Sequence, residues 1–351
     1  MVVTRSTRRR AAVAVALLAA VLTGCGGGDE AGTADRPTAG GGGASTGGPL
    51  KIGYSAWPGW FPLAVAEEKK LFEKAGVDVE LVYFADYISS LDAMAAGKLD
   101  ANTQTLNDTL VSVSAGRKQQ VVIVNDNSAG NDAIIVDKSI AEISDLKGKS
   151  VAAEQGVVDH FLLLQGLTKA GLSEKDIDFR NLTTDAAAAS FAAGELDAVG
   201  VFAPFTAEAL KRPGSRVLFD SADFPGTIPD FVVFEKDVVA KRRDDVQKVL
   251  DAWYATLDLI TQNPDEARAI MAKKAGLDVE TYASLEKGTR LFSAKEALDA
   301  FTAKEAPAGL VPMAEQINTF LVDTKLAEKP APLDQLFEPS FTAAYLKRSG
   351  G

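Results

Sequence analysis

From residue 50 onward, short apolar runs alternate with segments of helical spacing, and this alternation most limits what the chain can fold into. Residues 50–55 and 77–84 have the length and apolar content of strands. Residues 87–96 have the spacing of a helix, and Gly97 follows as a stop signal. Strands and helices in alternation, joined by short loops, are typical of a mostly parallel sheet covered by helices. We therefore expect an α/β fold.

The same order begins again after residue 145, and the two halves share a short internal repeat. Residues 95–101 read AAGKLDA and residues 192–198 read AAGELDA, so six of seven positions match at an offset of 97. Each copy is predicted to be a helix end, a glycine turn and the start of a strand. Two interpretations stay open: equivalent positions in two similar lobes, or coincidence at a common kind of junction in an Ala-rich chain.

The first 24 residues have the composition of an export signal. Four arginines precede an apolar run over residues 11–22, which is too short to span a bilayer core of about 20 helical residues. Residues 22–25 read LTGC and resemble a bacterial lipobox, which predicts lipid attachment at Cys25, the only cysteine. The arginines also resemble a twin-arginine signal, so the export route stays open. Residues 25–48 are Gly-rich and are predicted to be a flexible tether.

Charge and composition exclude several classes of function. Without residues 1–24, the formal net charge falls from −11 to −15, which is unfavourable for nucleic acid because phosphate contacts need Lys and Arg. No second apolar run reaches transmembrane length. The predicted domain has no cysteine, and its only histidine is His160, so neither a disulfide, a His/Cys metal cluster nor a Ser-His-Asp set is expected. We predict a protein without metal or cofactor that is not an enzyme.

Several motifs carry a resemblance to a known family. They are IGYS at residues 52–55 before an aromatic Pro-Gly loop, AEEKKLF at 66–72, LKGK at 146–149 and NPDEA at 263–267. Over residues 50–290 the chain resembles the nitrate/sulfonate/taurine group of binding proteins, which serve ABC importers. The resemblance implies a two-lobed clamp of the type II periplasmic-binding-protein fold, each lobe a mostly parallel sheet flanked by helices. It also implies a monomer that binds a small molecule and docks on a permease and its ATPase. Together with the predicted lipid at Cys25, this places the protein outside the cytoplasm, anchored to the cell membrane.

The resemblance also places the lobes and the two segments that cross between them. Lobe 1 is expected at residues 50–130 plus 230–347, and lobe 2 at residues 137–225. The crossings are expected near residues 127–136 and 223–229. Closure of two such lobes about a hinge is a recognised way to trap a ligand.

Ligands of open α/β sheets lie outside the carboxyl ends of the strands, and this rule selects the binding loops. Large aromatic side chains are unusual in a loop, so Trp57 and Trp60 are candidates for ligand contact, or alternatively plug the core of their own lobe. Asp86 and Asn107 are equally suited to capping helices, and His160 to a helix position beside the cleft. The predicted ligand-binding residues are Ser55, Trp57, Trp60, Phe61, Asp86, Tyr87, Thr105, Asn107, Asp108, Glu154, Gln155, Val157, Asp159, His160 and Phe202.

The charges of these loops bear on the ligand. They contain four carboxylates, at Asp86, Asp108, Glu154 and Asp159, and neither Lys nor Arg. An anion in a closed cleft generally needs cationic donors or helix-end amides, so a neutral polar or cationic solute is expected: guanidinium, an amine or a urea-like compound. The alternative is an alkanesulfonate, taurine or nitrate. From other classes, an enzyme similar to those that make the thiamine pyrimidine and a sensory or adhesive lipoprotein remain alternatives.

Overall fold

The computed structural model describes residues 47–350, and their strands form two sheets. One sheet has the strand order β11-β4-β10-β3-β1-β2, and the other has the order β7-β6-β8-β5-β9. The strands are β1 (Leu50–Tyr54), β2 (Val79–Tyr83), β3 (Ala101–Thr105), β4 (Gln119–Ser128), β5 (Asp132–Val136), β6 (Ser150–Ala153), β7 (Asp178–Asn181), β8 (Ala198–Phe202), β9 (Arg216–Asp220), β10 (Pro229–Glu235) and β11 (Thr289–Leu291).

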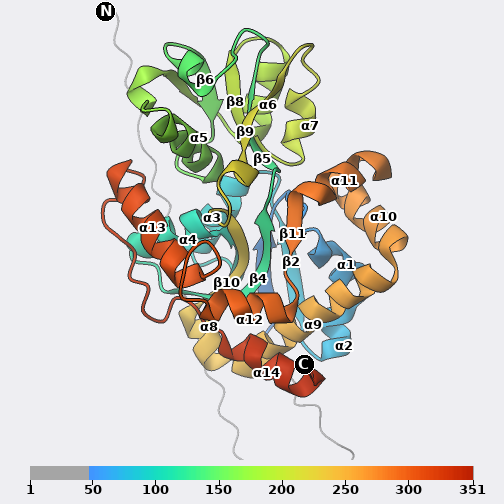
Figure 1. The fold of residues 1–351 in the computed structure, drawn as a ribbon. Helices are drawn as coiled ribbons and strands as arrows, with labels where there is room; N and C mark the ends of the chain where they lie inside the picture. The colour runs from blue at the N-terminus through green and yellow to red at the C-terminus, as the bar shows by residue number, and fades with distance from the viewer. Residues whose placement is uncertain (1–46, 351) are drawn as a thin grey trace, which may run out of the picture. The chain divides into compact units, whose positions relative to one another are not determined.

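Helices flank both sheets (Figure 1). They are α1 (Pro62–Glu68), α2 (Leu71–Ala75), α3 (Tyr87–Ala95), α4 (Leu106–Ser114), α5 (Val158–Lys169), α6 (Thr184–Ala192), α7 (Phe205–Ala209), α8 (Lys236–Lys241), α9 (Arg243–Gln262), α10 (Pro264–Ala275), α11 (Val279–Leu285), α12 (Ala294–Thr302), α13 (Leu310–Asp323) and α14 (Ser340–Ser349). We call the six-stranded sheet with α1–α4 and α8–α14 lobe 1, and the five-stranded sheet with α5–α7 lobe 2. Among residues 47–350, no helix combines the length and the apolar character needed to span a membrane.

The two sheets repeat one strand pattern. In lobe 1, β1 pairs in parallel with β2 and β3, and β10 runs antiparallel between β3 and β4. In lobe 2, β6 pairs in parallel with β7 and β8, and β5 runs antiparallel between β8 and β9. The reversed strand of each sheet is the one that enters from the other lobe. The predicted two-lobed α/β clamp fold is therefore confirmed. The expectation of a mostly parallel sheet in each lobe is wrong: antiparallel pairs outnumber parallel ones in lobe 1 and equal them in lobe 2, because the strand that crosses from the other lobe enters each sheet reversed.

The sequence repeat at an offset of 97 falls on equivalent positions of the two lobes. The bounds of α3 and β3 become those of α6 and β8 when 97 is added to each residue number. Oδ2 of Asp100 accepts a hydrogen bond from the amide of Lys51 on β1, and Oδ2 of Asp197 accepts one from the amide of Ser150 on β6, both at 2.9 Å. The repeat thus marks a junction that each lobe uses to fasten its first strand.

Two differences from the predicted elements have local causes. Residues 60–74, whose apolar spacing predicts one helix, form two helices, because Lys70 adopts a left-handed conformation with φ of 55° between α1 and α2. Strand β11 and helix α14 had no counterpart in the sequence prediction. Trp253 on α9 is 1% exposed and lies in the core. The predicted signal segment, the lipid site at Cys25 and most of the tether lie outside the described residues.

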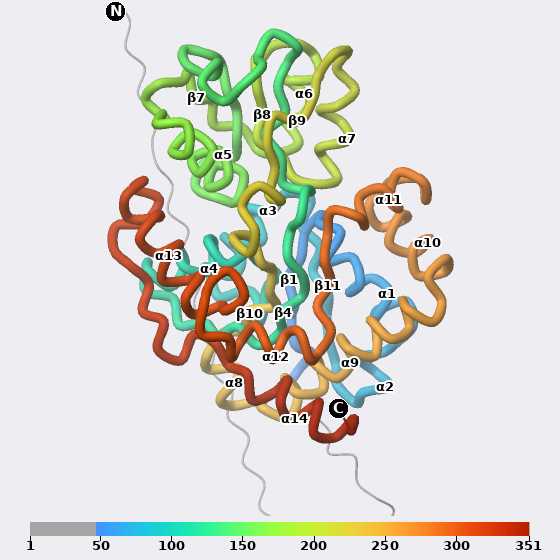
Figure 2. The backbone as a smooth tube through the Cα atoms, in the orientation of Figure 1, coloured from blue at the N-terminus to red at the C-terminus, as the bar shows by residue number. Residues whose placement is uncertain are grey.

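Two segments connect the lobes and lie side by side (Figure 2). Residues 129–131 join β4 to β5, and residues 221–228 lead from β9 to β10. The hydroxyl oxygens of Ser128 and Ser221 are 2.7 Å apart, and the amide of Gly130 donates to the Ser221 hydroxyl at 2.8 Å. Gly130 has a φ of 123°, which residues with a Cβ rarely adopt. Glycine therefore allows the first crossing segment to turn where it lies beside the second.

Candidate functional site

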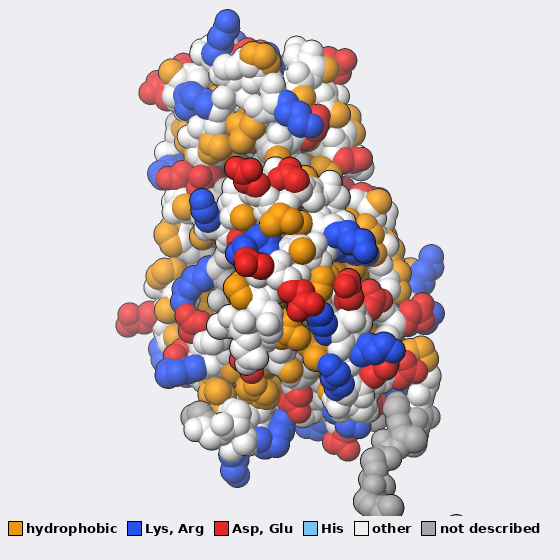
Figure 3. Space-filling model, turned by 90° about the vertical axis from the view of Figure 1, so that its right-hand side faces the viewer, with side chains coloured by type: hydrophobic (Ala, Val, Ile, Leu, Met, Phe, Trp, Pro, Cys, Tyr) orange, Lys and Arg blue, Asp and Glu red, His pale blue; other side chains and the backbone are white. Residues whose placement is uncertain are grey.

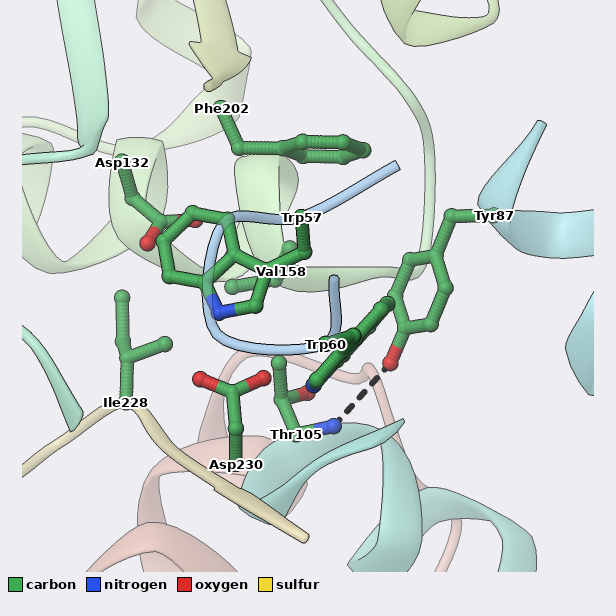
Figure 4. A pocket seen from close by; sticks show the side chains of 9 residues that line it. All are labelled: Trp57, Trp60, Tyr87, Thr105, Asp132, Val158, Phe202, Ile228 and Asp230. Carbon is green, nitrogen blue, oxygen red and sulfur yellow. Dashed lines mark hydrogen bonds between the residues drawn. The ribbon is translucent and has the colours of Figure 1, made fainter. Parts of the chain in front are cut away.

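A small cavity lies where the two lobes meet, and side chains from both lobes point into it (Figure 4). Its volume is about 10 Å³, roughly the space that one water molecule needs. Strand ends, helix starts and the second crossing all contribute to its wall. The lining residues are Trp57, Trp60, Tyr87, Thr105, Asp132, Val158, Phe202, Ile228 and Asp230.

Aromatic rings form most of the apolar wall. The Trp60 ring lies 6.4 Å from Trp57 and 5.3 Å from Tyr87 within lobe 1. Phe202, the last residue of β8 in lobe 2, meets this group edge-on, with its ring 6.4 Å from that of Trp57 and 6.1 Å from that of Tyr87. Edge-to-face contacts at these distances are favourable, so the aromatic contact between lobes holds the cleft closed.

The loop after β1 is fixed in place by a buried carboxylate. The indole Nε1 of Trp57 donates a hydrogen bond of 3.0 Å to Oδ1 of Asp126 on β4. The same carboxylate presses against Gly59, where a Cβ would lie 1.8 Å from Oδ2 of Asp126. The loop can therefore pack onto Asp126 only because residue 59 has no side chain.

Six buried carboxylates lie at or behind the wall of the cavity, and two of them, Asp132 and Asp230, line it. Asp108, Asp126 and Asp230 come from lobe 1, and Asp132, Glu154 and Asp159 from lobe 2; each is at most 4% exposed. Asp126 and Asp230 occupy paired positions on β4 and β10, so two like charges would stand opposite each other on one face of the sheet. None of the ion pairs formed by residues 47–350 involves any of the six.

Hydroxyl groups hold some of these carboxylates in each lobe. In lobe 1, the Tyr87 hydroxyl donates to Oδ2 of Asp108 at 2.9 Å and accepts from the amide of Thr105 at 3.1 Å. In lobe 2, the Thr184 hydroxyl oxygen lies 2.9 Å from Oε2 of Glu154 and 2.8 Å from Oδ2 of Asp159. A hydroxyl donates only one hydrogen, so one of these two contacts needs a protonated carboxyl group as its donor.

Burial changes the acidity of the whole cluster. Removal from water, which disfavours the charged form, raises the pKa of both Asp108 and Asp132 to about 7. The pKa values of Asp126 and Asp230 are also raised, first by burial and, for Asp230, then by the charge of Asp126. Burial raises the pKa values of Glu154 and Asp159 too. The cluster therefore holds protons at a pH where exposed carboxylates are ionised.

The structure brings many of the residues predicted from sequence to this site. Trp57, Trp60, Tyr87, Thr105 and Phe202 line the cavity. Asp108, Glu154 and Asp159 belong to the carboxylate cluster, and the side chains of Ser55, in the loop after β1, and of Asn107, in the first turn of α4, are buried. Asn107 donates from Nδ2 to Oδ1 of Asp108 at 2.8 Å, so it orients a cluster member.

Other predicted residues lie outside the cavity for identifiable reasons. Phe61 is in the core against Tyr282, at a ring distance of 6.0 Å. Asp86 caps α3, where its Oδ1 accepts from the amide of Ser89. The backbone amide of Gln155 donates to Asn181, and Val157 lies with Gln155 in a separate surface groove.

His160 also points away from the cavity. Its Nε2 lies 2.6 Å from Oε2 of Glu174, and its ring stacks on Phe179 at 4.6 Å. Burial, the largest effect, lowers the pKa of this imidazole against the opposing influence of Glu174. Both ring nitrogens and one ring face are thus engaged within lobe 2, since Nδ1 accepts a hydrogen bond from the amide of Gly156.

Sequence reasoning missed Asp126, Asp132, Val158, Ile228 and Asp230. The three aspartates lie on β4, β5 and β10, the strands that lead into or out of the crossings, which were treated as connections and not as binding segments. A signal was nevertheless present, because each aspartate sits beside an apolar run that reads as a buried strand. A carboxylate in such a position requires a specific environment.

The arrangement does not fit a metal ion. Within residues 47–350, no group of three or more His, Cys, Asp or Glu side chains is placed so that it could hold one. Of the six carboxylates, Asp132 and Asp230 line the cavity, and several of the others are already bound to hydroxyl or indole groups. The site can bind, orient and enclose a small molecule.

Comparison with known proteins places this site in a wider context. A protein of Brucella abortus, provisionally named a binding protein, is 27% identical over 84% of this chain and 92% of its own length. An Escherichia coli protein, provisionally named aliphatic sulfonates-binding, is 30% identical over 67% of this chain and 74% of its own length. The crystal structure of the periplasmic aliphatic sulphonate binding protein of E. coli has the same fold, with a TM-score of 0.69 and 24% identity, over 85% of this chain and all of that one.

A family model matches more than half of the chain. It covers residues 44–276, which include both sheets up to β10 together with α8–α10, and therefore every lining residue of the cavity. The chain belongs to the NMT1-like family.

Proposed function

We propose that this protein is the solute-binding component of an ABC importer and that it traps a small molecule between its lobes. The observation that carries the proposal is the cavity at the lobe junction, which is closed on one side by Trp57 and Tyr87 and on the other by Phe202. The names of several relatives, which are binding proteins, support the same function.

The lobes move, in this proposal, as two bodies made of residues 50–130 with 230–347 and of residues 137–225. A cavity of about 10 Å³ is too small for an organic solute, so entry requires the lobes to separate. Only the two crossings connect the lobes through the chain, and Gly130 gives one of them conformational freedom. The solute then stabilises the closed form by contacting both lobes, and the importer recognises that form.

For the class of solute, the relatives favour the alternative prediction over the primary one. The E. coli relatives include a taurine-binding periplasmic protein, 25% identical over 82% of this chain, and the aliphatic sulfonates-binding protein. These names support a sulfonate or taurine and give no support to a guanidinium- or urea-like solute. We therefore propose a solute of the sulfonate and taurine type.

The proposed partners follow from the same role. The protein would be exported, anchored by lipid at Cys25 outside the cell membrane, and would act as a monomer that delivers its solute to a permease and its ATPase. An enzyme remains the less favoured alternative, since chemical turnover would need a reactive group that points into the cavity, and the imidazole of His160 is directed to Glu174.

The test is a measurement of closure. Fluorescent labels at Lys98→Cys in lobe 1 and Lys175→Cys in lobe 2, both exposed positions, report the distance between the lobes by energy transfer. Addition of taurine or of a solute identified by mass spectrometry of the purified protein should narrow the distribution of distances. A matched pair at Lys98→Cys and Lys274→Cys, both in lobe 1, should not respond. A bound solute that leaves the first distance unchanged would contradict the clamp, and conversion of the solute to a product would contradict a role in binding alone.

A further inference from the structure

We propose that the carboxylate cluster of the cavity binds a protonated nitrogen group of the solute, an ammonium or guanidinium, and that the clamp selects for this group. The inference rests on the proposed function and narrows its solute class. Among solutes of the sulfonate and taurine type, it selects those that carry an amine and excludes simple alkanesulfonates.

Several buried carboxylate oxygens near the cavity have no hydrogen-bond partner. Oδ2 of Asp132 is buried, belongs to a residue that lines the cavity, and accepts no hydrogen bond. Oε1 of Glu154 and Oδ1 of Asp159 are also buried without a partner, whereas the side chains of Asp126 and Asp230 are hydrogen-bonded to each other. Buried polar atoms are rarely left unsatisfied in native proteins, so these oxygens indicate a donor that arrives with the ligand.

Within the part of the chain that the structure describes, these carboxylates also have no cationic side chain as a partner. On the surface, acidic and basic side chains are mixed (Figure 3), and pairs such as Arg290 with Glu296 and Lys295 with Asp299 neutralise each other. Within residues 47–350, no Lys or Arg lines the cavity or pairs with a cluster member. A buried carboxyl group is tolerated when it is protonated, and an ionised one is tolerated when a cation compensates its charge. A cationic solute would supply that compensation.

The aromatic side chains that line the cavity also suit a cation. The rings of Trp57, Trp60, Tyr87 and Phe202 converge on the cavity, and the faces of such rings attract ammonium and guanidinium groups (Figure 4). The one lining side chain with an unpartnered donor is Trp60, through its indole Nε1. A single indole cannot compensate a sulfonate surrounded by carboxylates. It could orient the sulfonate of a zwitterion whose ammonium lies at the carboxylates, as in taurine.

Protonation gives this site a pH dependence with a defined sign. Three titratable groups line the cavity: Tyr87 from α3, Asp132 from β5 and Asp230 from β10. Four more lie behind its wall: Asp108 from α4 is bonded to Tyr87, Asp126 from β4 is bonded to Trp57, and Glu154 before α5 and Asp159 on α5 interact electrostatically with the others. Burial raises the pKa values of all seven, and those of Asp108 and Asp132 reach about 7. A cation must displace protons from the carboxylates, so its affinity increases as the pH rises from about 5.5 to 8.

Isothermal titration calorimetry with three probes tests the selection. Guanidinium chloride carries only the cation, ethanesulfonate only the anion, and taurine both. We expect guanidinium or taurine to bind, ethanesulfonate not to bind, and the binding to release protons, which is measured as a heat that depends on the ionisation enthalpy of the buffer. Ethanesulfonate that binds as tightly as taurine would overturn the inference and leave the clamp intact. If neither taurine nor guanidinium binds, the inference is also overturned. If, in addition, mass spectrometry finds no bound solute of any kind, the proposed function fails with it.

Two variants separate ligand binding from folding. Asp132→Asn and Asp230→Asn keep the shape of the side chain and remove the negative charge, and each should weaken binding of the cationic probe by more than about 30-fold. Each should leave the melting temperature at pH 7.5 unchanged or higher, because a buried like charge is lost. Asp323→Asn, at an exposed position of α13, is the matched control and should change neither quantity. Unaltered binding by both cleft variants would overturn the proposal.

Discussion

Lobe 1 and lobe 2 share an arrangement of helices and strands but differ in the residues at the ends of these elements beside the cleft. Residues related by the offset of 97 begin α3 and α6 with Tyr87 and Thr184, and end β3 and β8 with Thr105 and Phe202. Both helix-starting residues use a hydroxyl group to hold buried carboxylates, Asp108 in lobe 1 and Glu154 with Asp159 in lobe 2. The junctions that hold the first strand have the same geometry in both lobes, whereas equivalent positions at the cleft carry different residues.

The aromatic side chains are distributed unevenly between the lobes. Lobe 1 supplies Trp57, Trp60 and Tyr87, which pack on one another and on Asp126 without help from lobe 2. Lobe 2 supplies Phe202, whose contacts with Trp57 and Tyr87 exist only when the lobes are together. The difference indicates that lobe 1 provides a preformed wall and lobe 2 a movable cover, while both lobes contribute carboxylates.

The largest effect should come from pH, because the carboxylates of both lobes act together. A carboxylate whose pKa is raised by folding binds its proton more tightly in the folded state, so stability falls as pH rises from the unfolded pKa of about 4 through the folded pKa. For Asp108 and Asp132, with folded values of about 7, the loss is on the order of 4 kcal/mol each. Urea unfolding without added solute should therefore show lower stability at pH 7.5 than at pH 5.

Variants in each lobe would divide this pH effect between the lobes. Asp108→Asn in lobe 1 and Asp159→Asn in lobe 2 should each flatten part of the decline, because each removes one group that titrates. A stability that rises between pH 5 and pH 7.5 would show that the cluster is hydrated and ionised. The carboxylates of the cleft would then have the same acidity as those on the surface.

The next largest effect should separate the preformed wall from the cover. Trp57→Ala removes a side chain that is 4% exposed and leaves Asp126 without its indole donor, so we expect a loss of about 3–5 kcal/mol in unfolding free energy. Phe202→Ala should cost less, about 1–2 kcal/mol, because its contacts with lobe 1 are absent whenever the lobes separate. Equilibrium unfolding in urea measures both, and equal losses would mean that the lobes do not open before they unfold.

The smallest effect concerns the equivalent junctions. Asp197 accepts hydrogen bonds from both the amide and the hydroxyl of Ser150, whereas Asp100 accepts one from the amide of Lys51. Asp197→Ala should therefore lower stability by about 2 kcal/mol and Asp100→Ala by about 1 kcal/mol. Thermal unfolding of the two variants, compared with Asp323→Ala as control, measures the difference. A larger loss for Asp100→Ala would contradict the ranking.

Much of the frame could be predicted from sequence because it follows from local patterns. Apolar runs and helical spacing located most strands and helices, and the AAGKLDA and AAGELDA segments located equivalent junctions, since helix ends and glycine turns depend on nearby residues. The break at Lys70 was missed because nothing in the local spacing requires a left-handed residue there. The loops that follow parallel strands were found because those strand ends lie at one edge of a sheet.

The sequence alone determined the alternation of strands and helices, the repeated junction and the aromatic loop around Trp57, all of which depend on residues close together in the chain. Only the tertiary structure decided that Asp126, Asp132 and Asp230 face one cavity, since they meet through the reversed strands β5 and β10, each inserted into the sheet of the opposite lobe. It also decided that His160 turns to Glu174. The physical reason is that burial and charge compensation depend on neighbours that are distant in sequence, and these set both the acidity of the cluster and the ligand it can accept.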